Sequence, residues 1–167
     1  MNILVIGRGW VGRKMFDQLV INGHIVTLCP HYKAEEAIHK VDYDWVVNCA
    51  GVTGIPNVDA CEKNKEDTLH GNVLWPQILT DWCTLNDIVL GHVSSGCIYQ
   101  GRRNDGKPFT EEDEPNFTWE KNNGSFYSGT KAIGEKVVSK LNKSYVWRLR
   151  IPFEENNNSR NYISKML

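Results

Sequence analysis

The chain has 167 residues, with 19 Lys and Arg against 20 Asp and Glu, and five cysteines. This length is typical of one domain with its own core, and the lack of a basic block or stripe argues against nucleic-acid binding and polybasic membrane attachment. No apolar run approaches the ~20 residues of a membrane span, and the start lacks the features of a signal peptide. The odd cysteine count without a C-x-x-C spacing predicts reduced thiols in a cytoplasmic compartment, and the scattered histidines predict no metal site.

Short apolar runs alternate with longer amphipathic segments, the pattern of a parallel sheet covered by helices. Each run is almost continuously apolar, as expected for strands buried on both faces. The predicted strands are Asn2–Ile6, His24–Leu28, Trp45–Cys49, Ile88–Val93 and Tyr145–Leu149. The predicted helices are Val11–Ile21, Ala34–His39, Val58–Asn64, Thr68–Leu85 and Ser125–Leu141. The fold class is therefore α/β, a doubly wound parallel sheet flanked by helices.

Three segments interrupt this alternation. Pro76 lies inside the fourth predicted helix and should kink or restart it. Residues 101–123 are polar and rich in Asn, Asp, Gly and Pro, which predicts a long surface loop, and such loops are usually functional. Ile163, Met166 and Leu167 are spaced as on one face of a helix that would begin where the chain stops, so we expect a truncated chain.

The stretch "ILVIGRGWVG" has the G-x-G-x-x-G spacing directly after a strand and at the start of a helix. Gly7 permits the tight turn, Gly9 lets the backbone approach a pyrophosphate, and Gly12 lets helix and strand pack closely. A pyrophosphate would lie at the helix N-terminus, where unpaired N–H groups favour an anion. The turn predicts a Rossmann-type dinucleotide-binding domain. The cofactor-binding residues predicted in it are Gly7, Gly9, Trp10, Val11 and Gly12; Trp10 would cover the pyrophosphate or pack in the first turn.

The second predicted strand ends in "TLCPHYK", without the Asp or Glu that would bind the 2′-hydroxyl of the adenosine ribose. His31 and Lys33 follow and could instead face a 2′-phosphate. This favours NADPH, with NADH as an alternative, although Lys33 is equally well explained as a solvated surface charge.

Tyr127 and Lys131 are four residues apart in "SFYSGTKAIGEKVV", so they share one face of a predicted helix. A tyrosine pKa near 10 is too high for proton exchange at neutral pH, and a neighbouring ammonium would lower it. Tyr127 could then donate a proton to a carbonyl oxygen as hydride reaches the carbon. A half-buried tyrosine beside a surface lysine is the alternative, and the dinucleotide turn upstream favours the catalytic interpretation.

The motifs "GRGWVG", "NCAGVTG", "SSGCIYQG", "EEDEPNF", "SFYSGTK" and "RLRIPF" with "NNSRNYISKML" together resemble the extended short-chain dehydrogenase/reductase superfamily. Within it the chain resembles dTDP-4-dehydrorhamnose reductases, and most of all bifunctional nucleotide-rhamnose synthases, which are UDP/dTDP-4-keto-6-deoxyglucose 3,5-epimerase/4-reductases. The resemblance covers essentially the whole chain. It implies a cofactor-binding domain over residues 1–153, followed at 154–167 by the start of a truncated C-terminal substrate-binding region.

The resemblance also implies roles for particular residues. Ser95, Tyr127 and Lys131 would form the reductase triad. Further cofactor contacts would come from Asn48, Ala50, Gly51 and Pro152, and substrate contacts from Thr53, Asn57, Asp59 and Ser95. Asn72, in "GNVLW", matches a helix asparagine of the superfamily for which we expect a structural role under the site.

Ser95 and Cys97 end the fourth predicted strand, two residues apart, so an extended backbone would point both to the cofactor side. Ser94 would face the opposite way and pack. Ser95 would donate a hydrogen bond to the 4-keto group of the substrate. The resemblance makes Cys97 a base and Lys165 an acid for inversion at C3 and C5. The alternatives are a small buried thiol for Cys97 and a solvated lysine for Lys165.

The function predicted from these residues is NADPH-dependent reduction, with 3,5-epimerisation, of a nucleotide-linked 4-keto-6-deoxyhexose to a nucleotide-rhamnose. A reductase without epimerase activity and a cofactor-binding regulatory subunit are the alternatives. The expected partner is a UDP- or dTDP-linked sugar substrate. A homodimer is a possible assembly.

Overall fold

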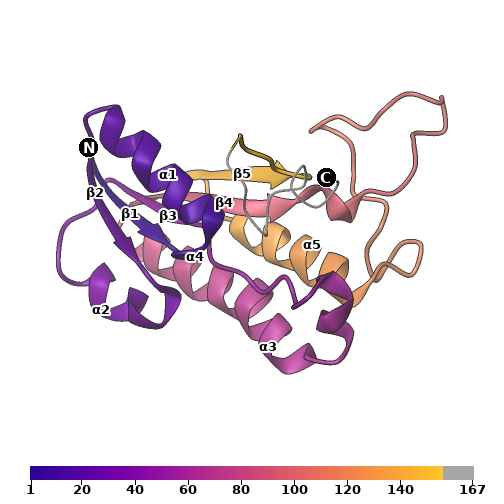
Figure 1. Cartoon of the computed structure of the whole chain (residues 1–167), viewed down its shortest axis with the longest axis horizontal. Helices are drawn as coiled ribbons and strands as arrows, with labels where there is room; N and C mark the ends of the chain where they lie inside the picture. Colours follow the sequence, from indigo (N-terminus) through magenta and orange to yellow (C-terminus); the bar gives the residue numbers. More distant parts are fainter. Residues whose placement is uncertain (156–167) are drawn as a thin grey trace.

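A five-stranded parallel sheet forms the centre of the computed structural model, which describes residues 1–155 (Figure 1). The strand order is β2-β1-β3-β4-β5, and every neighbouring pair is parallel. The strands are β1 (Asn2–Ile6), β2 (Ile25–Cys29), β3 (Trp45–Asn48), β4 (Val89–Ser95) and β5 (Ser144–Leu149). All five predicted strands are confirmed, with ends shifted by no more than two residues.

The helices and shorter turns lie between these strands. They are α1 (Trp10–Ile21), α2 (Ala34–Ile38), α3 (Lys65–Leu69), α4 (Trp75–Leu85), α5 (Phe126–Val138), η1 (His31–Lys33), η2 (Val58–Glu62), η3 (His70–Leu74) and η4 (Gly96–Ile98). The segment predicted as one helix over Thr68–Leu85 is divided by the π-helical turn η3, and Pro76 lies in the first turn of α4. Proline is tolerated there because the first amides of a helix have no intrahelical partner.

Helices cover both faces of the sheet, so the doubly wound α/β class is confirmed. Figure 1 shows α1 on one side and α2, α4 and α5 on the other. Alternate residues of β1 pack against the helices on opposite faces of the sheet, because successive side chains of a strand point to opposite faces. Ile3 and Val5 pack beneath α1, whereas Leu4 and Ile6 join the larger core with Leu79 of α4.

The carboxyl ends of β1, β3 and β4 lie side by side at one edge of the sheet. The chain turns from β1 to β2 in one direction and later continues from β3 in the other, so a switch point falls between β1 and β3, where ligands bind in open α/β sheets. The predicted surface loop over residues 101–123 contains no helix or strand and extends away from the sheet. The site is therefore assembled from three loops at one edge.

Candidate active site

The turn after β1 has the geometry that its glycines predict. Gly7 has φ +107°, and its N–H donates to Cys29 O at 2.9 Å, which holds the turn against the end of β2. A methyl group on Gly12 would overlap the carbonyl oxygen of Gly7, whereas one on Gly9 would meet nothing within 4 Å. Helix α1 begins at Trp10 without a side-chain cap or an acidic residue in its first turn. Its first amides are therefore available to an anion, and Gly9 leaves room for one to approach.

A hollow of about 630 Å³ adjoins this turn at the switch point. Its wall consists of the turn after β1, the loop after β3, the start of η1 just beyond β2, and the segment around η3. Its lining residues are Gly7, Gly9, His31, Cys49, Ala50, Gly51, Val52, Thr53, Gly54, Ile55, Asn64, Asp67, His70, Gly71 and Trp75. Its position and mixed apolar and polar lining suit a dinucleotide.

Asn48 shapes the loop after β3 from below. It is fully buried, its Oδ1 accepts from Ala50 N at 3.1 Å, and its Nδ2 lies 3.1 Å from Nδ1 of His92 on the adjacent strand. Burial, and then the charge of Lys131, lower the pKa of His92 well below its ordinary value, so the ring is neutral. A neutral His92 with an unprotonated Nδ1 can accept from Asn48, which orients the Asn48 oxygen toward Ala50.

Asn72 anchors the next residues of the same loop. It accepts from Val52 N at 2.8 Å and donates to Val52 O at 2.9 Å and to Thr130 Oγ1 at 3.2 Å. Thr130 belongs to α5, so Asn72 connects the loop after β3 to the helix that carries Tyr127. This geometry fits the structural role expected for Asn72.

Ser95, Tyr127 and Lys131 come together at the end of β4. Ser125 caps α5 by accepting from Ser128 N, and Ser128 Oγ donates to Cys97 O at 2.8 Å, so the start of α5 is tied to the turn after β4. Tyr127 is buried, and burial raises its pKa, partly offset by a hydrogen bond with Ser95. The phenol is therefore protonated at neutral pH.

Lys131 lies beneath the loop after β3. Its Nζ donates to Val93 O at 2.8 Å, and a methyl group on Gly51 would stand 3.8 Å from that Nζ. Burial lowers its pKa to about 8, although Glu135 and Cys49 oppose the shift. Burial, Ser95, Cys97 and Cys61 shift the pKa of Tyr127, and Lys131 is not among these influences. Burial is thus the largest influence on the pKa of Tyr127, and the Lys131 ammonium donates to the backbone of β4.

The backbone does not stay extended beyond Ser95. Ser95 caps the 3-10 turn η4 and accepts from Cys97 N at 3.2 Å. Both side chains nevertheless act on the Tyr127 phenol, Ser95 by a hydrogen bond and Cys97 through its charge when ionised. Ser94 is buried, as expected for a packing residue.

The remaining predicted residues are distributed around this centre. Thr53 lines the hollow, while Asn57 caps η2 by accepting from Asp59 N at 3.0 Å, and neither Asn57 nor Asp59 lines the hollow. Lys33 and Pro152 are exposed outside it. Lys165 lies outside the described residues. Trp10 and Val11 are half-buried at the start of α1.

Several site residues were not predicted from the sequence. Asn64, Asp67, His70 and Trp75 line the hollow, and His92 supports Asn48. Asn72, in "GNVLW", was the sequence feature that pointed to this segment. Only the fold shows that the lining residues near Asn72 in the sequence reach the switch point.

Residues 1–155 contain neither a membrane-spanning helix nor a cluster of metal-ligating side chains. No helix in this range is long and apolar enough to cross a bilayer. Nor do these residues place three or more His, Cys, Asp or Glu side chains together as a metal site.

Known proteins resemble this chain in sequence or in structure. A bifunctional dTDP-4-dehydrorhamnose 3,5-epimerase/dTDP-4-dehydrorhamnose reductase of Arabidopsis thaliana is 35% identical over 178 residues, covering 99% of this chain and 57% of that protein. A trifunctional UDP-glucose 4,6-dehydratase/UDP-4-keto-6-deoxy-D-glucose 3,5-epimerase/UDP-4-keto-L-rhamnose-reductase of the same plant is 39% identical over 134 residues, 77% of this chain and 19% of that protein.

The crystal structure of the L780 UDP-rhamnose synthase from Acanthamoeba polyphaga mimivirus superposes with a TM-score of 0.84 at 28% identity, covering 99% of this chain and 61% of that one. The chain thus spans less than two thirds of the length of each of these relatives. The family model described as the RmlD substrate binding domain matches residues 1–167. The resemblance seen in the sequence is confirmed: the chain belongs to the RmlD substrate-binding domain family.

Proposed function

We propose that the chain is the NADPH-binding and reducing part of an enzyme that converts a UDP- or dTDP-linked 4-keto-6-deoxyhexose to a nucleotide-rhamnose. The observation that carries the proposal is the arrangement at the end of β4. Tyr127 is hydrogen-bonded to Ser95, and Lys131 donates to Val93 O close to Gly51, which lines the hollow behind the glycine turn. The relatives' named reactions support this substrate class.

The residues around the hollow fit a nicotinamide dinucleotide. Gly7 and Gly9 and the uncapped start of α1 would hold the pyrophosphate, since a side chain at Gly9 would fill the open space before these amides. Asn48 and Asn72 fix the loop of Ala50 and Gly51, which would line the bound cofactor. When bound, the reduced nicotinamide would supply the hydride for the C4 carbonyl carbon.

Tyr127 and Ser95 would act on the carbonyl oxygen. Because the Tyr127 phenol is protonated at neutral pH, it can donate its proton to the oxygen as the carbon is reduced. Ser95 would hydrogen-bond the same oxygen and polarise the carbonyl. Lys131, with a pKa of about 8, remains largely cationic at pH 7 and would bind the nicotinamide ribose beneath Gly51.

Cys97 is our proposed base for epimerisation, with Lys165 as the proposed acid. Protons on C3 and C5 are acidic because they flank the keto group, and inversion requires removal from one face and return to the other. Cys97 is a half-buried free thiol beside Tyr127, where such a carbon would stand if the keto oxygen were bound by Ser95 and Tyr127. A thiolate that removed the proton would become a thiol, and Lys165 would return a proton on the opposite face.

Deuterium uptake separates the two half-reactions. The chain is incubated in heavy water with dTDP-4-keto-6-deoxyglucose and NADP⁺, and deuterium at C3 and C5 is measured by mass spectrometry. NADPH oxidation is followed in a second assay with the already epimerised sugar, dTDP-4-dehydrorhamnose. We expect uptake and oxidation in the wild type, oxidation lost in Tyr127→Phe, and uptake lost in Cys97→Ser. Oxidation without uptake would leave a reductase alone, and tight NADPH binding without either reaction would indicate a regulatory subunit.

A further inference from the structure

Two buried side chains of opposite charge lie one turn apart on α5. Lys131 is 5% exposed and Glu135 is 7% exposed. Residues four apart share one face of a helix, and α5 packs against β4 and β5 (Figure 1). Lys131 belongs to the proposed reductase triad, whereas Glu135 is a buried carboxylate that no step of the proposed reaction uses.

Glu135 is held in place by Arg148 of β5. The guanidinium donates from Nε to both carboxylate oxygens, at 2.9 and 3.1 Å, and its Nη2 forms a further bond with Oε1. Its Nη1 donates to the Tyr99 hydroxyl at 2.7 Å and to Glu111 O at 2.8 Å, so the arginine is itself fixed by two other groups. Charge-assisted bonds of this kind fix the position of the carboxylate.

The two cations approach the sheet at neighbouring positions. Lys131 Nζ donates to Val93 O at 2.8 Å, and Arg148 is the ladder partner of Ser94, the next residue of β4. Burial lowers the pKa of Lys131 to about 8, and the charge of Glu135 opposes this shift. The Glu135 carboxylate therefore serves both cations, Arg148 by direct contact and Lys131 through its charge.

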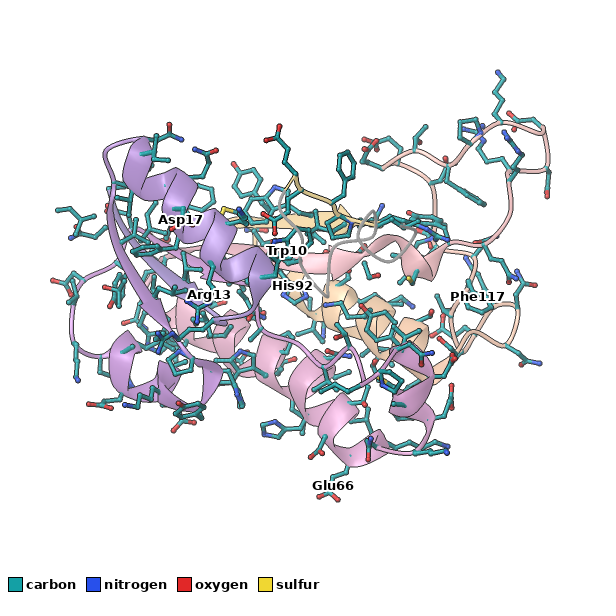
Figure 2. The ribbon with its side chains drawn as sticks, viewed as in Figure 1. Trp10, Arg13, Asp17, Glu66, His92 and Phe117 are labelled. Carbon is teal, nitrogen blue, oxygen red and sulfur yellow. The ribbon has the colours of Figure 1, made fainter. Side chains whose placement is uncertain are left out.

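The other titratable groups that face Lys131 carry no charge at neutral pH. Burial raises the pKa of the Cys49 thiol to about 12. Burial, and then the charge of Lys131, lower the pKa of His92, which Figure 2 labels near the middle of the molecule. The Tyr127 phenol, one turn before Lys131 on α5, is protonated because burial raises its pKa. Within residues 1–155, Glu135 is therefore the anion that favours the charged form of this lysine.

We infer that Glu135, fixed by Arg148, is a positioning residue that keeps Lys131 cationic for the nicotinamide ribose. The inference rests on the proposed function, in which the Lys131 ammonium binds that ribose. Inside a protein a carboxylate stabilises a nearby ammonium, and a buried lysine without such a partner releases its proton more readily. Glu135 does not line the hollow at the switch point, so it acts through Lys131.

Two substitutions break the same ion pair but change the charge around Lys131 in opposite directions. Glu135→Gln removes the anion and leaves the Arg148 guanidinium unbalanced, so the pKa of Lys131 should fall below about 8. Arg148→Met removes the cation and leaves the carboxylate to Lys131, so the same pKa should rise. A purely structural ion pair would not give opposite shifts, because both variants lose the same contact between α5 and β5.

The experiment is an NMR titration of the full 167-residue chain with ¹³C-labelled lysine, in which the Cε chemical shift reports protonation. The Lys131 signal is identified by its absence from Lys131→Arg. We expect its pKa to move by about one pH unit, down in Glu135→Gln and up in Arg148→Met. Glu120→Gln is the matched control, since Glu120 pairs with Lys136 on the exposed side of the same helix, and it should leave this pKa unchanged.

The pH dependence of NADPH binding, measured by fluorescence titration, gives a second measurement with the same signs. Affinity should fall as the pH rises through the pKa of Lys131, because the ribose loses its cationic partner. A fall of about one pH unit lowers the charged fraction at about pH 7.5 from about three quarters to about one quarter. Glu135→Gln should therefore bind NADPH about threefold more weakly than the wild type at this pH, and Arg148→Met at least as tightly.

A double variant keeps the test decisive if Glu135→Gln alone does not fold. Glu135→Gln combined with Arg148→Met contains no unpaired buried ion, and it should still lower the pKa of Lys131 relative to the wild type. Circular dichroism establishes that each variant is folded.

Three outcomes would overturn the inference. Shifts of the Lys131 pKa in the same direction in Glu135→Gln and Arg148→Met, or no shifts, would do so while leaving the proposed function in place. Opposite shifts that left the pH dependence of NADPH binding unchanged would show that the charge of Lys131 does not serve the cofactor. If the folded wild type bound no NADPH at any pH, the proposed function would fail and the inference with it.

Discussion

Replacing Lys131 with methionine should make the protein more stable at neutral pH. The Lys131 side chain is 5% exposed, and burial lowers its pKa from the ordinary 10.5 to about 8. The charged form is therefore less favourable in the folded than in the unfolded protein. At about 1.4 kcal/mol per pH unit, keeping Lys131 charged costs about 3 kcal/mol at pH 7.

This cost depends on pH in a defined direction. Below about pH 8 both states of the protein carry the charged lysine, so the full cost is present. Between about 8 and 10.5 the folded protein has released the proton and the unfolded protein has not, so stability rises with pH across this window. Methionine has a similar length and no charge, so Lys131→Met removes the cost. It also removes the hydrogen bond to Val93 O, which offsets about 1 kcal/mol.

The expected result is a gain of about 2 kcal/mol at pH 7, equivalent to a rise in Tm of about 4–8 °C for a chain of this size. The gain should disappear as the pH approaches 10. Urea unfolding at pH 7, 8, 9 and 10 measures it as the difference between wild type and variant. Lys136→Met is the control, since Lys136 lies on the same helix but is exposed and pairs with Glu120, and it should stay within about 0.5 kcal/mol of wild type. A destabilised Lys131→Met, or a gain that does not change with pH, would refute the reasoning.

Three further substitutions test other parts of the site. Gly12→Ala should destabilise the fold by about 3 kcal/mol, measured by urea unfolding, because the new methyl group would overlap backbone atoms. Gly9→Ala should unfold like the wild type, because its methyl group would meet no atom within 4 Å, but should bind NADPH at least about tenfold more weakly in a titration. Asn72→Ala should lose about 2–4 kcal/mol, since both backbone groups of Val52 lose their partner, and a loss below about 1 kcal/mol would contradict this. Tyr127→Phe should bind NADPH normally yet oxidise it about 10²- to 10⁴-fold more slowly with the keto sugar, and unchanged turnover would exclude Tyr127 as the proton donor.

Local patterns in the sequence account for most of the fold. Continuous apolar runs such as Asn2–Ile6 predicted strands buried on both faces, and they form the parallel sheet between two helical layers. The position of Pro76 predicted a kink or a restart within a long helical segment, and α4 begins one residue before it, at Trp75. Predictions of this kind succeed because they depend on neighbours within a few residues, where periodicity and backbone sterics act.

The interpretation of the site needed the structure wherever distant residues meet. The support of Asn48 by His92 joins positions 44 apart, and that of Asn72 by Thr130 joins positions 58 apart. Neither pair follows from periodicity, because the pairing of strands and the packing of helices decide them. The sequence pattern placed Ser95 and Cys97 on one side on the condition that the backbone stays extended. The Ser95 side chain instead caps a 3-10 turn there, and both residues still influence Tyr127.

The sequence by itself determined the glycine turn, the parallel sheet and the two residues Tyr127 and Lys131 on one helix face, since each is encoded by residue type and short spacing. Only the tertiary structure decided their electrostatics. Lys131 is buried and donates to the backbone of β4, and burial is the main cause that lowers its pKa. Burial and charge depend on everything that surrounds a group in space, and that environment is established only when the chain folds.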